Sequence, residues 1–432
     1  MMREHDASLH INPIKPQDER TRYSWGSLHN IPGVRSTSPL GWIVFCALTL
    51  GVNSSHAQTG PTERKVSAAT RLDWEFAARG FGPGAAKLPM GYDSTKQKYQ
   101  LYIPKSYRKD KPAPLVLFIS ASDSPAGWKN WQAICEKEGV LFASPFGAGN
   151  TPENGRRVRV ILDVLDDIRR NYAIDPEQTY LTGFSGGGRL TCAIGFALPE
   201  FFGGIVPICG TNPLHTMAYL RHRAEDRLSV AFVTGEKDFN RKENEKAMHP
   251  WCEEVGIRSK LWIVPKMGHE VPQASVLSEV YAWLAADLKR RRDDAKARPL
   301  LAVKADDTPS AAEQAKRLVA AAQDELKQPA RTWRGVTLLQ GVTQRWPKSD
   351  AARMAQMMLK DIVNDDKRLQ LVEQQGAADE VRSVSAQAKA LEQLGNVAKA
   401  IEAWDFLAKN YEGLPIAKTA LENIQRLRAK AK

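Results

Sequence analysis

Short apolar runs alternate with longer helical patterns between residues 98 and 288, and this alternation limits the chain to few folds. Several runs are apolar at every position, as in strands of a parallel sheet that is covered on both faces. Strands that alternate with crossover helices predict a three-layer α/β domain with a mostly parallel sheet. The strand-like runs are 98–104, 114–120, 140–146, 179–184, 204–210, 230–235 and 260–265, and the helical segments are 126–138, 157–172, 187–199, 241–256 and 273–291. We therefore expect the α/β domain to span residues 98–291.

The rest of the chain differs in character. Residues 292–310 are charged and contain prolines, so we interpret them as a linker. Residues 311–432 lack strand-like runs and are rich in helix-forming residues. Two turns, 346–352 and 411–417, share an aromatic residue, a proline and an alanine that starts a helix, and the second resembles a degenerate tetratricopeptide-type hairpin. We expect an all-α region of helical hairpins that packs on the α/β domain and could bind a protein partner.

The first 57 residues have the features of an export signal. Residues 40–52 form a largely apolar run. This run is shorter than the about 20 residues that span a bilayer. Ser55-His56-Ala57 supplies the small residues of a cleavage site. We expect 1–57 to be removed, 58–97 to form an N-terminal extension, and the protein to be periplasmic or extracellular without an integral membrane domain. An uncleaved N-terminal anchor is the alternative.

Of five cysteines, Cys46 lies in that apolar run. The other four form either two disulfides, in one of three pairings, or a set of buried thiols. They are Cys135, Cys192, Cys209 and Cys252. No spacing typical of a metal site occurs, so we predict neither a metal nor a cofactor.

The net charge of +12 raises the question of nucleic-acid binding. The densest basic run, residues 289–292, coincides with the expected end of a helix, where cations complement the helix dipole. Basic runs interleaved with aromatic residues, typical of nucleic-acid interfaces, are missing from the sequence. We therefore predict no nucleic-acid partner.

Ser185 lies in the pattern Gly183-Phe184-Ser185-Gly186-Gly187, which fits G-x-S-x-G. A strand-like run precedes the pattern and a helical segment follows it, as a nucleophile elbow requires. The glycines leave room for the sharp turn. The context predicts that Ser185 is a nucleophile, and a glycine-rich structural turn is the alternative.

A serine nucleophile needs a base that is itself oriented by a carboxylate. Hydrolases of this topology place them in the order Ser, Asp, His, with the last two after later strands. Asp238 follows the run 230–235, and His269 follows the run 260–265. The order therefore predicts a triad of Ser185, Asp238 and His269.

Residues 98–288 resemble an α/β-hydrolase, and more narrowly the secreted esterases grouped with poly(3-hydroxybutyrate) depolymerases and feruloyl esterases. The resemblance rests on LYIPKSY (101–107), PLVLFIS (114–120), IDPEQTYLTGFSGGGR (174–189) and the loops that carry Asp238 and His269. It implies a secreted serine hydrolase that cleaves carboxylic esters, such as polyesters or esters linked to polysaccharides, through an acyl-enzyme.

The sequence departs from this family at the oxyanion loop, where Ser120-Ala121-Ser122 stands in place of the usual His-Gly. The resemblance implies backbone donors from Gly186 and from either Ala121 or Ser122. Two alternatives stay open. One is a serine peptidase of the same fold, and the other is a catalytically weak binding protein that docks a partner through its helical repeats.

Overall fold

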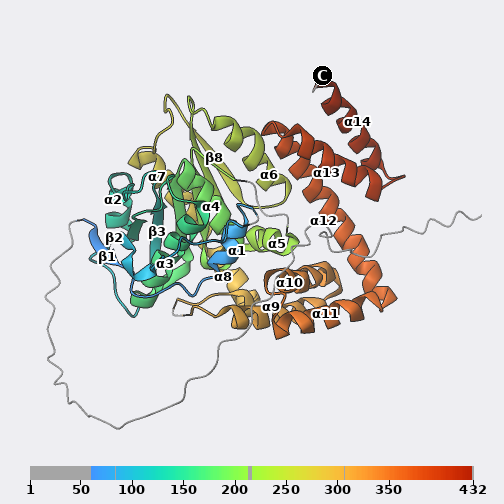
Figure 1. The fold of residues 1–432 in the computed structure, drawn as a ribbon, viewed down its shortest axis with the longest axis horizontal. Helices are drawn as coiled ribbons and strands as arrows, with labels where there is room; N and C mark the ends of the chain where they lie inside the picture. The colour runs from blue at the N-terminus through green and yellow to red at the C-terminus, as the bar shows by residue number, and fades with distance from the viewer. Residues whose placement is uncertain (1–59, 83, 213–216, 306, 431–432) are drawn as a thin grey trace, which may run out of the picture. The chain divides into compact units, whose positions relative to one another are not determined.

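A computed structural model describes residues 60–82, 84–212, 217–305 and 307–430. The expected export signal, its cleavage site and Cys46 lie outside the described residues. Figure 1 follows the described elements from β1 in blue to α14 in red. No helix in the described part of the chain is both long enough and apolar enough to cross a bilayer.

One sheet of eight strands forms the centre of the described α/β region, in the order β1-β2-β4-β3-β5-β6-β7-β8. Strand β2 is antiparallel to β1 and β4, and all other neighbours are parallel. The strands are β1 Thr62–Lys65, β2 Lys98–Tyr102, β3 Ala113–Ile119, β4 Leu141–Pro145, β5 Ile174–Phe184, β6 Gly204–Ile208, β7 Ser229–Gly235 and β8 Ser259–Val264. All seven strands expected from the sequence are present, and the sheet is mostly parallel as predicted.

Helices cover both faces of this sheet. Along β3, Leu115, Leu117 and Ile119 join the apolar core under α3 and α4, whereas Val116 and Phe118 join the core under α2 and α7. This alternation follows from the period of two in a strand. The helices are α1 Trp74–Arg79, α2 Trp128–Glu138, α3 Asn154–Asn171, α4 Gly186–Ala197, α5 Ala218–Arg227, α6 His249–Glu254, α7 Ala274–Ala286 and α8 Leu288–Ala297. The three layers and the strand order are those of the α/β-hydrolase fold.

Residues 58–97 contribute a strand and a helix that the sequence patterns do not predict. Strand β1 pairs with β2, and α1 packs on α3 and α4. Three buried carboxylates of α3, Asp163, Asp166 and Asp167, each accept a hydrogen bond from a backbone N–H group of the segment that precedes α1. The donors are Ser67, Thr70 and Arg71, at 2.7–2.8 Å. The carboxylates therefore fix this segment to the α/β core.

Two expected helices are each divided in the structure. The segment 241–256 contains a π-helical turn, η3 (Glu243–Met248), before α6. The segment 273–291 is interrupted at Asp287, where α7 ends and α8 begins, and α8 continues into the expected linker. The basic run 289–292 therefore lies at the start of α8 and not at a helix end, which corrects the sequence interpretation.

This basic run makes structural contacts. Arg291 is fully buried, and its guanidinium donates hydrogen bonds to the carbonyl oxygens of Glu177 and Leu284, at 2.8 and 2.9 Å. Arg290 pairs with Asp287 at 2.7 Å, and Arg292 pairs with Asp175. These arginines therefore hold α8 against the sheet.

Four cysteines lie in the described part of the chain, and all four are buried free thiols. They are Cys135, Cys192, Cys209 and Cys252. Of the two alternatives that the sequence left open, the structure has the one without disulfides among these residues.

The C-terminal region is all-helical, as predicted. Its first helix begins with a capping box in which Ser310 and Glu313 each bind the other's backbone N–H group. The two turns singled out in the sequence each join two helices, α10 to α11 and α13 to α14. The helices are α9 Ala311–Leu326, α10 Thr332–Arg345, α11 Asp350–Val363, α12 Asp366–Gln393, α13 Val397–Asn410 and α14 Pro415–Lys430. That these helices form tetratricopeptide-type repeats stays a prediction.

Buried charges connect α12 to the α/β region. Asp379 of α12 accepts hydrogen bonds from Arg221 and His222 of α5, and from the indole of Trp333. Burial alone would raise the pKa of Asp379, but the hydrogen bond from His222 and the charge of Arg221 hold it well below its usual range. The carboxylate is therefore ionised, and it joins α12 to α5 and α10.

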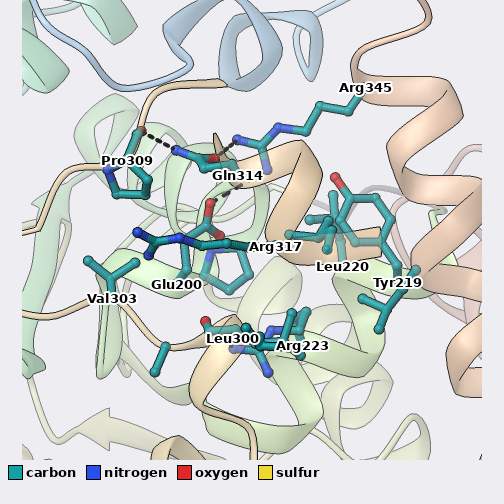
Figure 2. A pocket seen from close by; sticks show the side chains of 15 residues that line it. Glu200, Tyr219, Leu220, Arg223, Leu300, Val303, Pro309, Gln314, Arg317 and Arg345 are labelled. Atoms are coloured by element: carbon teal, nitrogen blue, oxygen red, sulfur yellow. Dashed lines mark hydrogen bonds and ion pairs between the residues drawn. The ribbon is translucent and has the colours of Figure 1, made fainter. Parts of the chain in front are cut away.

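A small cavity lies where α5 meets α9 and α10, and Figure 2 shows its lining. Its volume of ≈ 30 Å³ is enough for a water molecule but not for a substrate. Gln314 and Arg345 meet at its wall, where Arg345 Nη2 donates to Gln314 Oε1 at 3.3 Å. The cavity is lined by none of the predicted triad residues.

Candidate active site

Ser185 occupies a sharp turn between β5 and α4. Its backbone has φ 54° and ψ −116°, a region that residues with a side chain rarely adopt. A strained backbone of this kind is maintained only where the surrounding structure enforces it, and such strain concentrates at functional sites. Strand, turn and helix thus follow one another as the sequence predicts for a nucleophile elbow.

Two glycines make this turn possible because other backbone segments pass close to them. A Cβ atom on Gly183 would lie 2.5 Å from the carbonyl oxygen of Gly187. One on Gly187 would lie 2.2 Å from the carbonyl oxygen of Ile119, at the end of β3. Any larger residue at either position would push the elbow away from the sheet.

The structure brings Ser185, His269 and Asp238 together in one hydrogen-bonded chain. Ser185 Oγ lies 2.9 Å from His269 Nε2, and His269 Nδ1 lies 2.8 Å from Asp238 Oδ1. The serine follows β5, the acid follows β7 and the histidine follows β8. With Nδ1–H donating to the carboxylate, Nε2 is left as the acceptor for the serine hydroxyl. Such an arrangement can remove the hydroxyl proton.

Asp238 is held as a carboxylate by several donors. Its side chain is fully buried, and it accepts hydrogen bonds from Thr234 Oγ1 at 2.7 Å and from the N–H group of Asn240 at 3.0 Å. Burial raises the pKa of Asp238, but the hydrogen bonds from Thr234, His269 and Asn240 outweigh it and lower the pKa below its usual value. The group is therefore ionised at neutral pH and can orient the imidazole.

Two aromatic rings flank His269. The ring of Phe239 stacks on the imidazole with 4.1 Å between ring centroids and 28° between planes, and Phe184 lies at 4.9 Å on a tilted plane. Phe239 is 76% exposed, which is unusual for a phenylalanine. Phe184 lies inside the G-x-S-x-G pattern at the end of β5, but the sequence does not reveal that Phe239 stacks on the histidine, because nothing in the local pattern distinguishes this loop phenylalanine.

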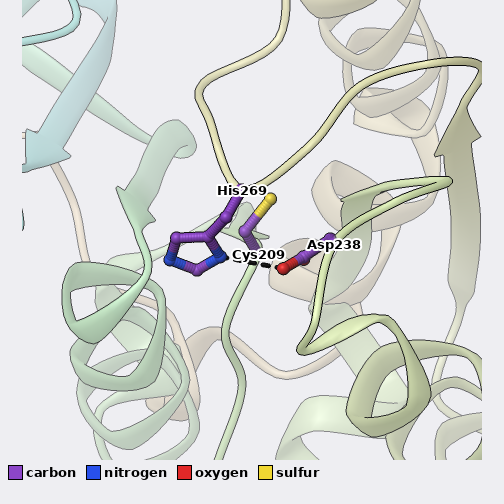
Figure 3. Close-up of side chains that lie close together, drawn as sticks. All are labelled: Cys209, Asp238 and His269. Carbon is purple, nitrogen blue, oxygen red and sulfur yellow. Dashed lines mark hydrogen bonds and ion pairs between the residues drawn. The ribbon is translucent and has the colours of Figure 1, made fainter.

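Cys209 lies beside the acid and the histidine, as Figure 3 shows. Ligand atoms of Cys209, Asp238 and His269 lie within 4.8 Å of one another, a spacing that could hold a metal ion. Burial, together with the charge of Asp238, raises the pKa of the thiol to about 12. Its Sγ donates to the carbonyl oxygen of Glu270 at 3.4 Å, and the two oxygens of Asp238 lie within hydrogen-bond distance of His269 Nδ1 and Thr234 Oγ1. The donor set therefore fits a hydrogen-bonded acid and base better than a metal centre.

The loop expected to supply oxyanion donors follows β3. The N–H group of Ser122 donates to Ser120 Oγ at 3.1 Å, so one of the two expected loop donors is already engaged. For the N–H group of Ala121 no acceptor is found among the described residues. The N–H group of Gly186, in the first turn of α4, has no acceptor within its helix. Ala121 and Gly186 are thus the two expected backbone donors that remain unengaged.

No family model matches the chain, but comparisons with individual proteins find related enzymes. A poly(3-hydroxybutyrate) depolymerase from Ralstonia pickettii is 31% identical over 106 residues, which is 21% of this chain and 22% of its own length. A probable carboxylesterase SOBER1-like from Arabidopsis thaliana is 25% identical over 190 residues, 40% of this chain and 66% of its own. Feruloyl esterase C from Emericella nidulans is 27% identical over 163 residues, 32% of this chain and 59% of its own.

The chain thus spans between about a fifth and about two thirds of the length of these relatives. Among solved structures, an S-formylglutathione hydrolase from Staphylococcus aureus is similar with a TM-score of 0.37 and 12% identity, over 52% of this chain and 99% of that one. A thermostable esterase has a TM-score of 0.36 and 20% identity, over 45% of this chain and 60% of that one. The chain has the α/β-hydrolase fold, and its homologues are a poly(3-hydroxybutyrate) depolymerase, a carboxylesterase and a feruloyl esterase.

Proposed function

We propose that this protein is a serine hydrolase that cleaves carboxylic esters through Ser185, His269 and Asp238. The observation that carries the proposal is the chain of two hydrogen bonds, 2.9 Å and 2.8 Å long, that joins the three side chains at a strained nucleophile elbow. A serine, a histidine and a buried carboxylate in this order are the parts of an acyl-transfer site.

In the proposed reaction, Ser185 Oγ attacks the ester carbonyl carbon while His269 Nε2 takes the hydroxyl proton. The N–H groups of Gly186 and Ala121 donate to the oxyanion of the tetrahedral intermediate. His269 then gives its proton to the leaving alcohol, which departs and leaves an acyl-serine. A water molecule, deprotonated by His269, attacks the acyl-serine, and His269 returns the proton to Ser185 Oγ as the acid is released. Asp238 stays ionised throughout and stabilises the imidazolium.

The substrates that we propose are esters of the kinds named by the relatives, which are a hydroxyalkanoate polyester and feruloyl esters. We propose that the protein acts outside the cytoplasm, because residues 40–57 have the pattern of an export signal.

Hydrolysis of p-nitrophenyl butyrate tests the function. We expect turnover by the wild-type protein, and a loss of about 10⁴-fold or more in kcat for Ser185→Ala, because no other group replaces the nucleophile. Ser278→Ala is the matched control and should keep the wild-type kcat, since the Ser278 hydroxyl donates to the carbonyl oxygen of Ala274 within α7. A wild-type protein without turnover on short esters would count against the proposal.

Replacing Phe239 by alanine should lower kcat/KM for the same ester by about 2- to 10-fold, because a stacked aromatic pair is worth about 0.5–1.5 kcal/mol. The ring covers one face of His269 and helps to hold the imidazole in place. Phe239→Tyr keeps the ring and should retain the wild-type value. Equal kcat/KM values for Phe239→Ala and the wild type would show that the stacking does not contribute to catalysis.

A further inference from the structure

Asn150 contacts both segments that carry the proposed oxyanion donors. Its backbone N–H donates to the carbonyl oxygen of Ala121 at 2.9 Å. Its side chain lies against Gly186, where a Cβ atom would come within 1.9 Å of Asn150 Oδ1 and 3.1 Å of Asn150 Nδ2. The residue after the nucleophile is therefore a glycine next to the amide group of Asn150.

A buried arginine sets the orientation of this amide. Arg157 of α3 donates from Nη2 to Asn150 Oδ1 at 3.0 Å, and its Nε and Nη1 donate to the carbonyl oxygen of Ala148 and to Asn154 Oδ1. Burial lowers the pKa of Arg157 to about 10, so the guanidinium is charged at neutral pH. Because a guanidinium only donates, the amide oxygen of Asn150 must face Arg157, and the amide nitrogen must face away from it.

The Nδ2 group of Asn150 is available to a ligand. Within the described residues it donates to no acceptor, and Asn150 is exposed. An amide held by a charged partner and left free at its nitrogen is a preorganised donor, which costs little reorganisation when negative charge develops nearby.

We propose that Asn150 Nδ2 donates a third hydrogen bond to the oxyanion, beside the N–H groups of Ala121 and Gly186. This inference rests on the proposed function. It also explains how the site can tolerate Ser120-Ala121-Ser122 in place of His-Gly, since a side-chain donor supplements the loop. Loss of one such donor lowers kcat by about 10²–10³-fold.

Asn150→Asp separates this role from a purely structural one. The carboxylate has nearly the shape of the amide and accepts from Arg157 at least as well, so a structural role predicts near-wild-type activity. As an oxyanion donor, the same change removes the N–H and adds a negative charge, so kcat for p-nitrophenyl butyrate should fall at least about 10²-fold with little change in KM. Asn154→Asp is the matched control, because Asn154 accepts from the same guanidinium at 3.1 Å and should keep wild-type kcat.

Asn150→Ala provides a second variant and should also lower kcat by about 10²-fold, with circular dichroism and a urea transition like those of the wild type. Fluorophosphonate labelling of wild-type Ser185 keeps the two proposals distinguishable. An unlabelled wild-type protein would contradict the proposed function. A labelled and active wild type with an equally active Asn150→Asp variant would overturn the role of Asn150 and leave the proposed function standing.

Discussion

Replacing His269 by glutamine is expected to lower kcat for p-nitrophenyl butyrate by about 10⁴-fold or more. Glutamine can still form a hydrogen bond, but it cannot take the proton from Ser185 Oγ, which lies 2.9 Å from the imidazole nitrogen. The ester carbonyl would then face a neutral hydroxyl, a poor nucleophile. Initial-rate kinetics across substrate concentrations would measure the loss.

His249→Gln is the matched control for this change. The imidazole of His249 is also partly buried and lies 2.9 Å from a serine hydroxyl, that of Ser259, but it contacts no residue of the proposed triad. We expect kcat of the His249→Gln variant to equal the wild-type value. A His269→Gln variant that retains near-wild-type turnover would remove His269 from the mechanism.

Replacing Arg345 by methionine is expected to lower the free energy of unfolding by about 3–5 kcal/mol. The Arg345 side chain is 2% exposed, and its guanidinium contacts Asp73 at 2.9 Å and Glu200 at 3.5 Å. Methionine fills part of the space but removes the guanidinium from two carboxylates that are only 17% and 16% exposed. Urea unfolding followed by circular dichroism measures the change.

The comparison for Arg345 is Arg353→Met, which breaks an ion pair with Asp350. The Arg353 side chain is 69% exposed, and exposed pairs contribute at most about 1 kcal/mol. The urea midpoints of the Arg345→Met and Arg353→Met variants should therefore differ clearly. Equal midpoints would show that Arg345 does not hold α10 to the α/β region.

The sheet could be predicted because its strands are apolar and buried on both faces. Strand β1 could not, because all four of its residues are exposed and polar or charged, as suits an edge strand. Helix α5 could not be predicted from the sequence for a related reason. It buries charged residues such as Arg221 and Arg227, which are compensated by partners distant in sequence, so no apolar stripe marks it.

The burial of three aspartates of α3 also could not be predicted from the local sequence pattern. In the sequence, Asp163, Asp166 and Asp167 have the spacing of a solvated helix face, yet each is buried. The backbone N–H groups that they bind lie 93 to 100 residues earlier in the chain, in the segment before α1. A helical pattern cannot reveal such partners.

The grouping of Ser185, Asp238 and His269 could be predicted because chain order and strand ends determine where these side chains meet. Asn150 and Cys209 could not, because each reaches the site through tertiary contacts that no short motif encodes, and although Phe239 follows Asp238 in the chain, its stacking on His269 is likewise a tertiary contact. Asn150 follows β4 and meets Gly186 only because the loop after β4 crosses the elbow. In the expected oxyanion loop, the sequence does not distinguish Ala121 from Ser122, because the two differ by one detail of the folded loop, the hydrogen bond from the Ser122 N–H group to Ser120 Oγ.

The mass of the intact protein after incubation with a fluorophosphonate tests the central claim most directly. We predict that the wild-type protein gains the mass of one phosphonyl group, and that peptide mapping places it on Ser185. We predict that Ser185→Ala gains none. A wild-type protein that stays unmodified, or a Ser185→Ala variant that is modified to the same extent, would contradict the account.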